Sequence, residues 1–249
     1  MKSQTGRRNK DRLPEIRART LDVRGKLPAP IINLLTRSQQ SKVRSISTML
    51  DYQRGGRTIF SEGEDAHFVY CVNSGVVRIS RCAEGGRRQV LAFMMPGDLF
   101  GIPESGIYLN SAEAVCPSSL YRIPWQNLLG LLLREPELQL NLLVRVAFDL
   151  RQAQRRILVL GQQNVMQRLA SFLMDFIQHP DFYDAKKQIL SFPLSRPDVG
   201  DYLGSAPETI ARAFASLEKL GLIRRASPRL IEILNAEALR GVLTGRRRN

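Results

Sequence analysis

The spacing of apolar side chains changes along this chain, and the first half carries the pattern of short strands. Between residues 51 and 124, the runs RTIF, HFVYCVN, GVVRIS, RQVLAFMM and SLYRIP alternate with glycines. Short β-type runs at roughly ten-residue spacing, with glycine at the turns, are typical of antiparallel barrels and rolls. The pattern therefore predicts an antiparallel barrel or roll.

A long helix is predicted after the strands. Residues 136 to about 160 contain no internal glycine or proline, and about 25 residues is long for a helix, since the mean is about 11–12. Apolar positions three or four residues apart form a stripe that can serve as a seam between two copies. The seam residues are Leu138, Leu142, Val146, Leu150, Ala153 and Ile157. The alternative is packing within one domain, because the apolar face is broad. A hinge at residues 161–164 and a second helix, VMQRLASFLMDFIQ, follow.

Residues 194–222, LSRPDVGDYLGSAPETIARAFASLEKLGL, predict two helices joined by a tight turn. Ser195 is suited to cap the first helix, and Gly204 can adopt the left-handed conformation that ends it. In the second helix, apolar residues recur every three or four positions and point inward. They are Ile210, Ala213, Phe214, Leu217 and Leu220.

The opposite side of the second helix carries Glu208, Thr209 and Arg212 near its N-terminal end. That end of a helix-turn-helix presents side chains to the major groove of DNA. Two short β-type runs, LIRR and RLIEIL, follow and predict a basic hairpin, or wing. A helical hairpin inside a larger domain is the alternative, but the wing favours DNA binding.

Charge agrees with a nucleic-acid partner. The chain has 37 Lys and Arg against 23 Asp and Glu, a net charge of +14 and a pI near 10.4. Such a surplus favours polyanions, because neutralised phosphates release counterions. Residues 1–30 hold nine basic and three acidic side chains. The first 25 residues lack a sustained apolar period and are predicted to be disordered. This tail either contacts phosphates or is simply a solvated basic segment.

Several classes of protein are disfavoured by the sequence. No apolar run reaches the roughly 18–20 residues that span a bilayer, and the charged N-terminus is unlike a signal peptide, so we expect a cytoplasmic protein. Cys71, Cys82 and Cys116 are widely spaced without a CxxC pair, which predicts no disulfide framework. Buried packing is expected for these thiols. No phosphate loop, metal cluster or nucleophile–base pair indicates an enzyme, and no cofactor is expected.

The order of these parts resembles the Crp/Fnr family of bacterial transcription regulators. The similarity runs from Arg54 to Leu234 and is carried by IFSEGEDAHFVYCVNSGVVRI, MPGDLFG, SAEAV, VMQRLASFL and SRPDVGDYLG with ETIARAF. The last two segments look most like the Fnr and FixK branch. The resemblance implies an α+β fold with a basic tail (1–25), a β-roll sensor-like domain (26–133), a dimerisation helix and hinge (134–163) and a winged-helix DNA-binding domain (164–249).

The resemblance also assigns residues to double-stranded DNA. In that branch the recognition helix carries Glu, then Ser and Arg three and four positions on; Glu208 and Arg212 match, whereas Ala211 replaces the serine. Arg212 has the planar donor fork that suits guanine, and Glu208 can accept from cytosine or orient Arg212. A surface ion pair is the alternative. Arg196, Ser205 and Thr209 are expected at the DNA backbone. The loss of the serine predicts a site preference that departs from the family pattern.

The effector site departs from the family's cyclic-nucleotide cassette. FGE is Phe100-Gly101-Ile102 here, and Arg-Ser-Ala is Asn110-Ser111-Ala112. A buried cyclic phosphate needs a cation or converging N–H donors, so Gly101, Ile102, Asn110 and Ser111 predict a degenerate pocket. The absence of cysteine before Cys71 excludes the family's iron–sulfur site.

These observations predict a homodimeric regulator of a two-fold symmetric DNA site that is independent of cyclic nucleotide. The alternative is a regulator gated by an unidentified small effector or redox signal in the β-roll. A regulatory module of an enzyme or channel is disfavoured by the helix-turn-helix. Residues 179–183 resemble in position the loop through which family activators touch RNA polymerase, and an ordinary surface loop is the alternative.

Overall fold

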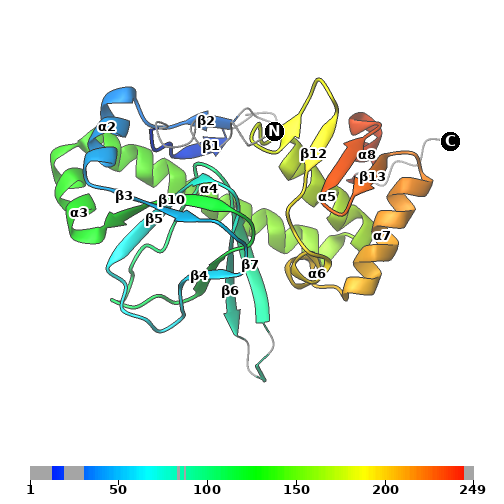
Figure 1. The fold of residues 1–249 in the computed structure, drawn as a ribbon, viewed down its shortest axis with the longest axis horizontal. Coiled ribbons are helices and arrows are strands. Elements are labelled where there is room, and N and C mark those ends of the chain that lie inside the picture. The colour runs from blue at the N-terminus through cyan, green and yellow to red at the C-terminus, as the bar shows by residue number, and fades with distance from the viewer. Residues whose placement is uncertain (1–12, 20–30, 83–84, 87, 244–249) are drawn as a thin grey trace. The chain divides into compact units, whose positions relative to one another are not determined.

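The computed structural model describes residues 13–19, 31–82, 85–86 and 88–243. The chain divides into two compact units, Met1–Asp149 and Leu150–Asn249, whose elements are labelled in Figure 1. The boundary falls inside the long helix α4 (Pro136–Gln162). Residues 134–163, expected to form a segment of their own, are therefore shared between the two units. The predicted α+β class is confirmed.

The first unit contains the predicted antiparallel β-roll. Two four-stranded sheets, in the orders β3-β10-β5-β8 and β4-β9-β6-β7, form the roll. Its strands are β3 (Thr48–Tyr52), β4 (Arg57–Phe60), β5 (Phe68–Ser74), β6 (Val77–Cys82), β7 (Arg88–Met94), β8 (Leu99–Phe100), β9 (Ser111–Ala114) and β10 (Ser118–Pro124). The β5–β6 turn requires Gly75, whose φ is +83° and whose added Cβ would lie 2.6 Å from the Pro117 carbonyl oxygen.

Part of the segment that was predicted to be disordered is ordered. Residues 13–19 include strand β1 (Arg17–Arg19), which pairs with β2 (Ile31–Asn33). Ile16 and Ala18 are only 6% and 3% exposed. The prediction is therefore wrong for residues 13–19, because the side chains of Ile16 and Ala18 are buried in the first unit. Residues 1–12 and 20–25 of the expected tail lie outside the described residues.

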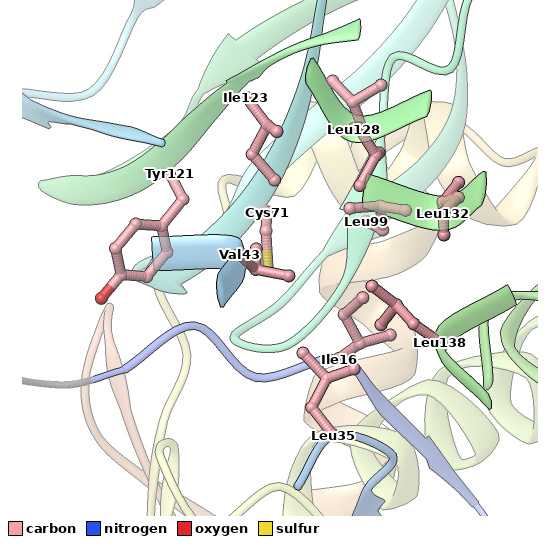
Figure 2. Close-up of a cluster of buried hydrophobic side chains, with 11 residues drawn as sticks. Ile16, Leu35, Val43, Cys71, Leu99, Tyr121, Ile123, Leu128, Leu132 and Leu138 are labelled. Carbon is pink, nitrogen blue, oxygen red and sulfur yellow. The ribbon is translucent and has the colours of Figure 1, made fainter. Parts of the chain in front are cut away.

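Helices close one side of the roll. α2 (Arg37–Ser45) begins with a capping box between Thr36 and Gln39, and α3 (Trp125–Arg134) follows β10. Figure 2 shows the apolar cluster that these elements share with β5, β8, the N-terminal segment and the start of α4. Its members are Ile16, Leu35, Val43, Val69, Cys71, Leu99, Tyr121, Ile123, Leu128, Leu132 and Leu138.

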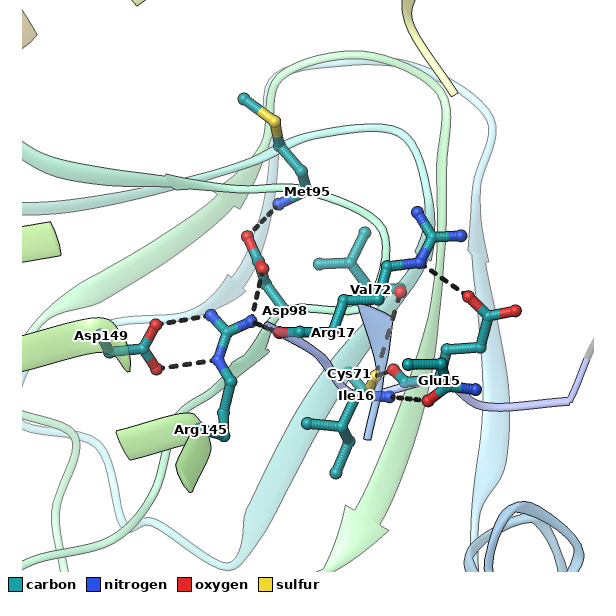
Figure 3. Close-up of polar contacts among 10 residues, drawn as sticks. Glu15, Ile16, Arg17, Cys71, Val72, Met95, Asp98, Arg145 and Asp149 are labelled. Carbon is teal, nitrogen blue, oxygen red and sulfur yellow. Dashed lines mark hydrogen bonds and ion pairs between the residues drawn. The ribbon is translucent and has the colours of Figure 1, made fainter. Parts of the chain in front are cut away.

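A buried arginine fastens α4 to the first unit (Figure 3). The side chain of Arg145 is 3% exposed, pairs with Asp98 at 2.9 Å and Asp149 at 2.6 Å, and donates to the carbonyl oxygen of Arg17. Burial opposes the charge of Arg145, but the two carboxylates outweigh it and raise the pKa of the guanidinium. A buried cation is tolerated when its donors are satisfied in this way.

The second unit combines α5 (Val165–Ile177), α6 (Arg196–Leu203), α7 (Pro207–Lys219) and α8 (Ala236–Leu243) with one antiparallel sheet of order β11-β12-β14-β13. The strands are β11 (Tyr183–Asp184), β12 (Ile189–Ser191), β13 (Ile223–Ser227) and β14 (Leu230–Ile233). Asn164, placed in the expected hinge, caps α5 with Gln167 in a capping box. Among the described residues, no helix has both the length and the apolar character needed to cross a membrane.

Candidate nucleic-acid interface

Interactions between residues close in sequence define the ends of the helices in the helix–turn–helix of residues 195–219. The hydroxyl of Ser195 accepts the Asp198 N–H at 3.2 Å and donates to its carboxylate at 2.6 Å. Gly204 ends α6 with a φ of 64°, in the left-handed region. Ala206 is the N-cap of α7, and its side chain makes no capping hydrogen bond.

The turn brings the two helices into close contact at Gly200. A Cβ added there would lie 2.5 Å from the carbonyl oxygen of Ser205. The N–H of Ser205 in turn donates to the carbonyl of Gly200 at 3.0 Å. A side chain at position 200 would thus force the turn apart and change the angle between the two helices.

The inner face of α7 is fixed by aromatic packing. Phe214 is fully buried, and its ring centroid lies 6.2 Å from that of Phe192. Phe192 in turn meets the ring of Phe176 on α5 at 5.0 Å in an edge-on arrangement. These contacts fix the position of α7 relative to α5. The backbone that carries the exposed side chains on the other face of α7 is therefore fixed as well.

The predicted base readers lie on that outer face. Glu208, Ala211 and Arg212 are exposed, and Thr209 is half-buried. Arg212 donates to the Thr209 hydroxyl at 3.1 Å, so its partner in this structure is Thr209 and not Glu208. Both charged side chains are therefore accessible to base edges.

The residues that were expected to contact the DNA backbone differ in their surroundings. The Arg196 guanidinium lies 3.6 Å from the centre of the Phe214 ring and is half-buried. Burial lowers the pKa of Arg196, and the neighbouring Arg225 lowers it further. Ser205 is half-buried in the turn.

The wing contributes a contact that sequence reasoning missed. Glu218 of α7 accepts both the backbone N–H of Arg225, at 2.9 Å, and its guanidinium, at 2.5 Å. These hydrogen bonds hold the pKa of Glu218 below its usual range. On the same strand, Arg224 pairs with Glu232 across the hairpin. The charges of the wing were visible in the sequence, but their partners were not.

Three further arginines missed by sequence reasoning fix the last turns of α4 to the second unit. Arg155 pairs with Asp175 at 2.9 Å, and Arg156 donates to the carbonyl of Tyr202 at 2.8 Å. Arg168 of α5 donates to the carbonyls of Leu160, Gln163 and Leu203 at 2.6, 2.9 and 3.0 Å. Residues 150–162 of α4 are therefore held firmly to α5 and α6.

In the first unit, aromatic rings occupy the interior beside the expected effector site. The rings of Phe60 and Tyr108 stack at 3.7 Å, and those of Tyr70 and Phe100 at 5.4 Å. All four side chains are buried. A Cβ added to Gly101 would lie 3.1 Å from the Phe60 ring.

The other residues of the expected effector site supply no cation. Ile102 is 39% exposed, and Asn110 is half-buried. The hydroxyl of Ser111 accepts the Glu62 N–H at 3.0 Å. No group of three or more His, Cys, Asp or Glu side chains in the described part of the chain is arranged to hold a metal.

The three cysteines differ in exposure. Cys71 is buried and donates to the Glu15 carbonyl at 3.1 Å; burial raises the pKa of its thiol to about 12. This residue therefore stays a neutral thiol near pH 7. Cys82 is exposed and Cys116 is half-buried, so the expectation of buried packing is wrong for Cys82.

Comparison with known proteins identifies the family. The cyclic nucleotide-binding domain model matches residues 51–135, and the Crp-like helix-turn-helix domain model matches residues 167–242. The nitrogen fixation regulation protein FixK of Azorhizobium caulinodans is 36% identical over 183 residues, which cover 73% of this chain and 74% of FixK. The chain belongs to the Crp/Fnr family. It is accordingly a DNA-binding transcription regulator.

Other members of the Crp/Fnr family extend the likeness to the three-dimensional fold. FixK of Rhizobium meliloti is 33% identical over 187 residues, covering 75% of this chain and 83% of that protein. The structure of FixK2 from Bradyrhizobium japonicum matches with a TM-score of 0.72 and 31% identity, over 79% of this chain and 96% of FixK2. The predicted family and fold are confirmed.

The contact at Gly200 generates a stability prediction. Gly200→Ala is expected to lower the free energy of unfolding by on the order of 3 kcal/mol, because a methyl group would overlap the backbone of the turn. Gly241→Ala is the matched control, since its Cβ would meet nothing within 4 Å and helical alanine is favoured over glycine by about 0.5–1 kcal/mol. Urea unfolding measures both, and equal stability of the two variants would contradict the close contact.

Proposed function

We propose that this Crp/Fnr protein is a homodimer that reads a two-fold symmetric DNA site through α7 and does so without a cyclic nucleotide. One observation carries the proposal: α7 presents Glu208 and Arg212 together on an exposed face, while Phe214 fixes its other face in the core of the second unit. A helix anchored in this way can enter the major groove as a rigid element.

Base reading is assigned to Glu208 and Arg212. The Arg212 guanidinium can exchange its hydrogen bond to Thr209 for the O6 and N7 atoms of guanine, and Glu208 can accept from cytosine N4. Ala211 adds only a methyl group between them, which suits an apolar contact with thymine and no hydrogen bond. Thr209, Ser205 and Arg196 are assigned to backbone phosphates.

Dimerisation is assigned to the exposed apolar face of α4. Val146, Leu150 and Ile157 are 46%, 60% and 70% exposed, and Ala153 is also exposed. Leu138, in contrast, is 2% exposed and lies in the core of the first unit, and Leu142 packs against that core. Leu143, which is 64% exposed, extends the seam instead. The set Leu143, Val146, Leu150, Ala153 and Ile157 has the alternating three- and four-residue spacing of a coiled coil.

The seam and the recognition helix are mechanically linked within one unit. Leu150, Ala153 and Ile157 lie on the part of α4 that belongs to the second unit. Arg155 and Arg156, on the same turns, bind α5 and α6. Pairing of two copies along α4 would therefore fix the separation of two α7 helices, as a site with two half-sites requires.

Independence from cyclic nucleotide is supported by the chemistry of the β-roll. Ile102 and Asn110 stand where the family cassette has a carboxylate and a cation, and the aromatic rings around Phe60 fill the adjacent interior. An anionic phosphate would gain no charge-assisted hydrogen bond from these two side chains. Redox gating through Cys82 remains the second candidate, because this thiol is exposed.

A contact with RNA polymerase is assigned to the exposed part of the loop at residues 179–183 and the turn that follows it. His179 and Phe182 are 6% and 9% exposed, so they support the loop from inside. Asp181, Lys186 and Lys187 lie at the surface of this segment, where Asp181 pairs with His179 and Lys187 with Asp184.

Base reading predicts a specific loss for Arg212→Ala. The variant is expected to lose about 1–3 kcal/mol of discrimination at one base pair of each half-site, which is about 5- to 150-fold in relative affinity. Binding to unrelated duplex should persist and stay sensitive to salt. Fluorescence anisotropy with single-base variants of a selected site measures both quantities. Arg240→Ala is the control, because it removes an equal charge from an exposed position on α8. Unaltered discrimination between base pairs by Arg212→Ala would refute the assignment.

The seam predicts that Leu150→Glu yields monomers. Two buried glutamates facing each other would repel and lose hydration, so the pair of helices should separate. Light scattering after gel filtration should report half the wild-type mass. Leu133→Glu is the matched control, since Leu133 is 79% exposed on α3 and lies off the seam. An unchanged mass for Leu150→Glu would remove α4 from the interface.

Independence from cyclic nucleotide is tested with purified protein and no added effector. We expect a randomised DNA pool to yield a two-fold symmetric site under these conditions, because the pocket side chains Ile102 and Asn110 provide no cation for a phosphate. Cyclic AMP and cyclic GMP should leave the affinity for that site unchanged and give no heat in calorimetry. A site recovered only in the presence of either nucleotide would contradict this part of the proposal.

A further inference from the structure

Two arginines from different elements meet over one aromatic ring beside α7. The guanidinium of Arg196, the first residue of α6, lies 3.6 Å from the centre of the Phe214 ring. That of Arg225, on the wing strand β13, lies 5.9 Å from the same centre. Because Phe214 is fully buried in the core of the second unit, the ring is a fixed platform for both cations.

Glu218 holds the second of these arginines at two points. One carboxylate oxygen accepts the backbone N–H of Arg225 at 2.9 Å, and the other accepts its guanidinium at 2.5 Å. The wing strand and its side chain are thus tied to α7 by the same residue. The side chains of Arg225 and Glu218 remain 34% and 28% exposed, so the guanidinium can still reach a ligand.

In this structure, one N–H donor group of Arg196 has no acceptor among the described residues. Its Nη1 atom is buried and has no hydrogen-bond partner among the described residues. The two guanidinium groups also repel each other, and the carboxylate of Glu218 offsets this repulsion only in part, so a further anion would be favoured. Planar guanidinium forks are well suited to phosphate oxygens. The geometry therefore favours a phosphate group at this place.

We propose that Arg196 and Arg225 clamp one backbone phosphate of the DNA, and that Glu218 is the positioning residue that fastens the wing half of this clamp to α7. The inference rests on the proposed function, since it requires that α7 enters the groove. The inference adds that the wing and α7 bind the DNA together as one rigid element. The clamped phosphate would then set how far α7 slides along the groove.

The test uses the full-length protein, a selected DNA site and an unrelated duplex, with the dissociation constant measured over a range of KCl concentrations. Arg225→Ala is expected to weaken binding to both duplexes by a similar factor. The slope of log affinity against log salt should fall by about 0.9 for each phosphate that the variant no longer neutralises. Arg225→Lys, which keeps the charge without the fork, should retain most of the slope. An unchanged slope in Arg225→Ala would overturn the clamp.

Glu218→Gln separates positioning from simple charge. The substitution raises the net charge by one, so long-range electrostatics alone predicts tighter binding, whereas loss of positioning predicts weaker binding. Glu232→Gln is the matched control, because Glu232 pairs with Arg224 on the same wing, and it should bind as tightly as wild type or tighter. Affinity of Glu218→Gln equal to or above wild type would overturn the positioning role.

A double-mutant cycle completes the experiment. If Glu218 acts through Arg225, Glu218→Gln should weaken binding in the wild-type background and not in the Arg225→Ala background. Equal losses in both backgrounds would show that Glu218 acts otherwise, for example through folding, which thermal unfolding of each variant checks. A wild-type protein that binds no specific duplex would instead refute the proposed function and leave a distinct signature, because every variant would then be equally inactive.

Discussion

The fastening of α4 by arginines, one of them buried, is the interaction on which the rest of the structure depends. In the first unit, Arg145 satisfies two carboxylates and a backbone carbonyl. In the second unit, Arg155, Arg156 and Arg168 bind side chains and carbonyls of α4, α5 and α6. Guanidinium groups are suited to this task, because five donors in a plane can satisfy several acceptors at once. The opposite face of α4 is left apolar and exposed, so the helix is free to pair with a second copy.

A consequence follows from where the unit boundary falls. Because α4 changes unit between residues 149 and 150, the C-terminal part of the proposed seam is already part of the DNA-binding unit. Only short links then separate the proposed seam from the outer face of α7. Arg156 bridges from α4 to Tyr202, and the turn that packs against Gly200 joins α6 to α7. Each link is closely packed, so dimerisation through α4 would set the positions of the proposed base readers, Glu208 and Arg212.

Sequence patterns anticipated the parts of this fold that rest on local contacts. The long helix was expected at residues 136–160 and spans Pro136–Gln162; the caps at Ser195 and Gly204 lie where the sequence placed them. Long-range partnerships were not visible. Arg145 and the carbonyl of Arg17 are 128 residues apart in the sequence, so periodicity gives no sign of the contact or of order in residues 13–19. Leu138 is a second example. Its spacing in the sequence matches the seam, but spacing alone does not distinguish a side chain that faces a second copy from one that faces the core.

The segment MPGDLFG has a structural role in this chain that does not depend on a ligand. Asp98 accepts the Met95 N–H at 2.7 Å, which shapes the turn before β8, and its other oxygen receives Arg145 of α4. Gly97 lies against the Arg17 side chain, leaving no room for a Cβ. These contacts give the loop a structural role in holding α4 that needs no effector. Ile102 and Asn110, the residues of the proposed degenerate pocket, lie outside these contacts, so a substitution at either position would leave the attachment of α4 intact. The β-roll would then support α4, the proposed dimerisation helix, whether or not a ligand is bound.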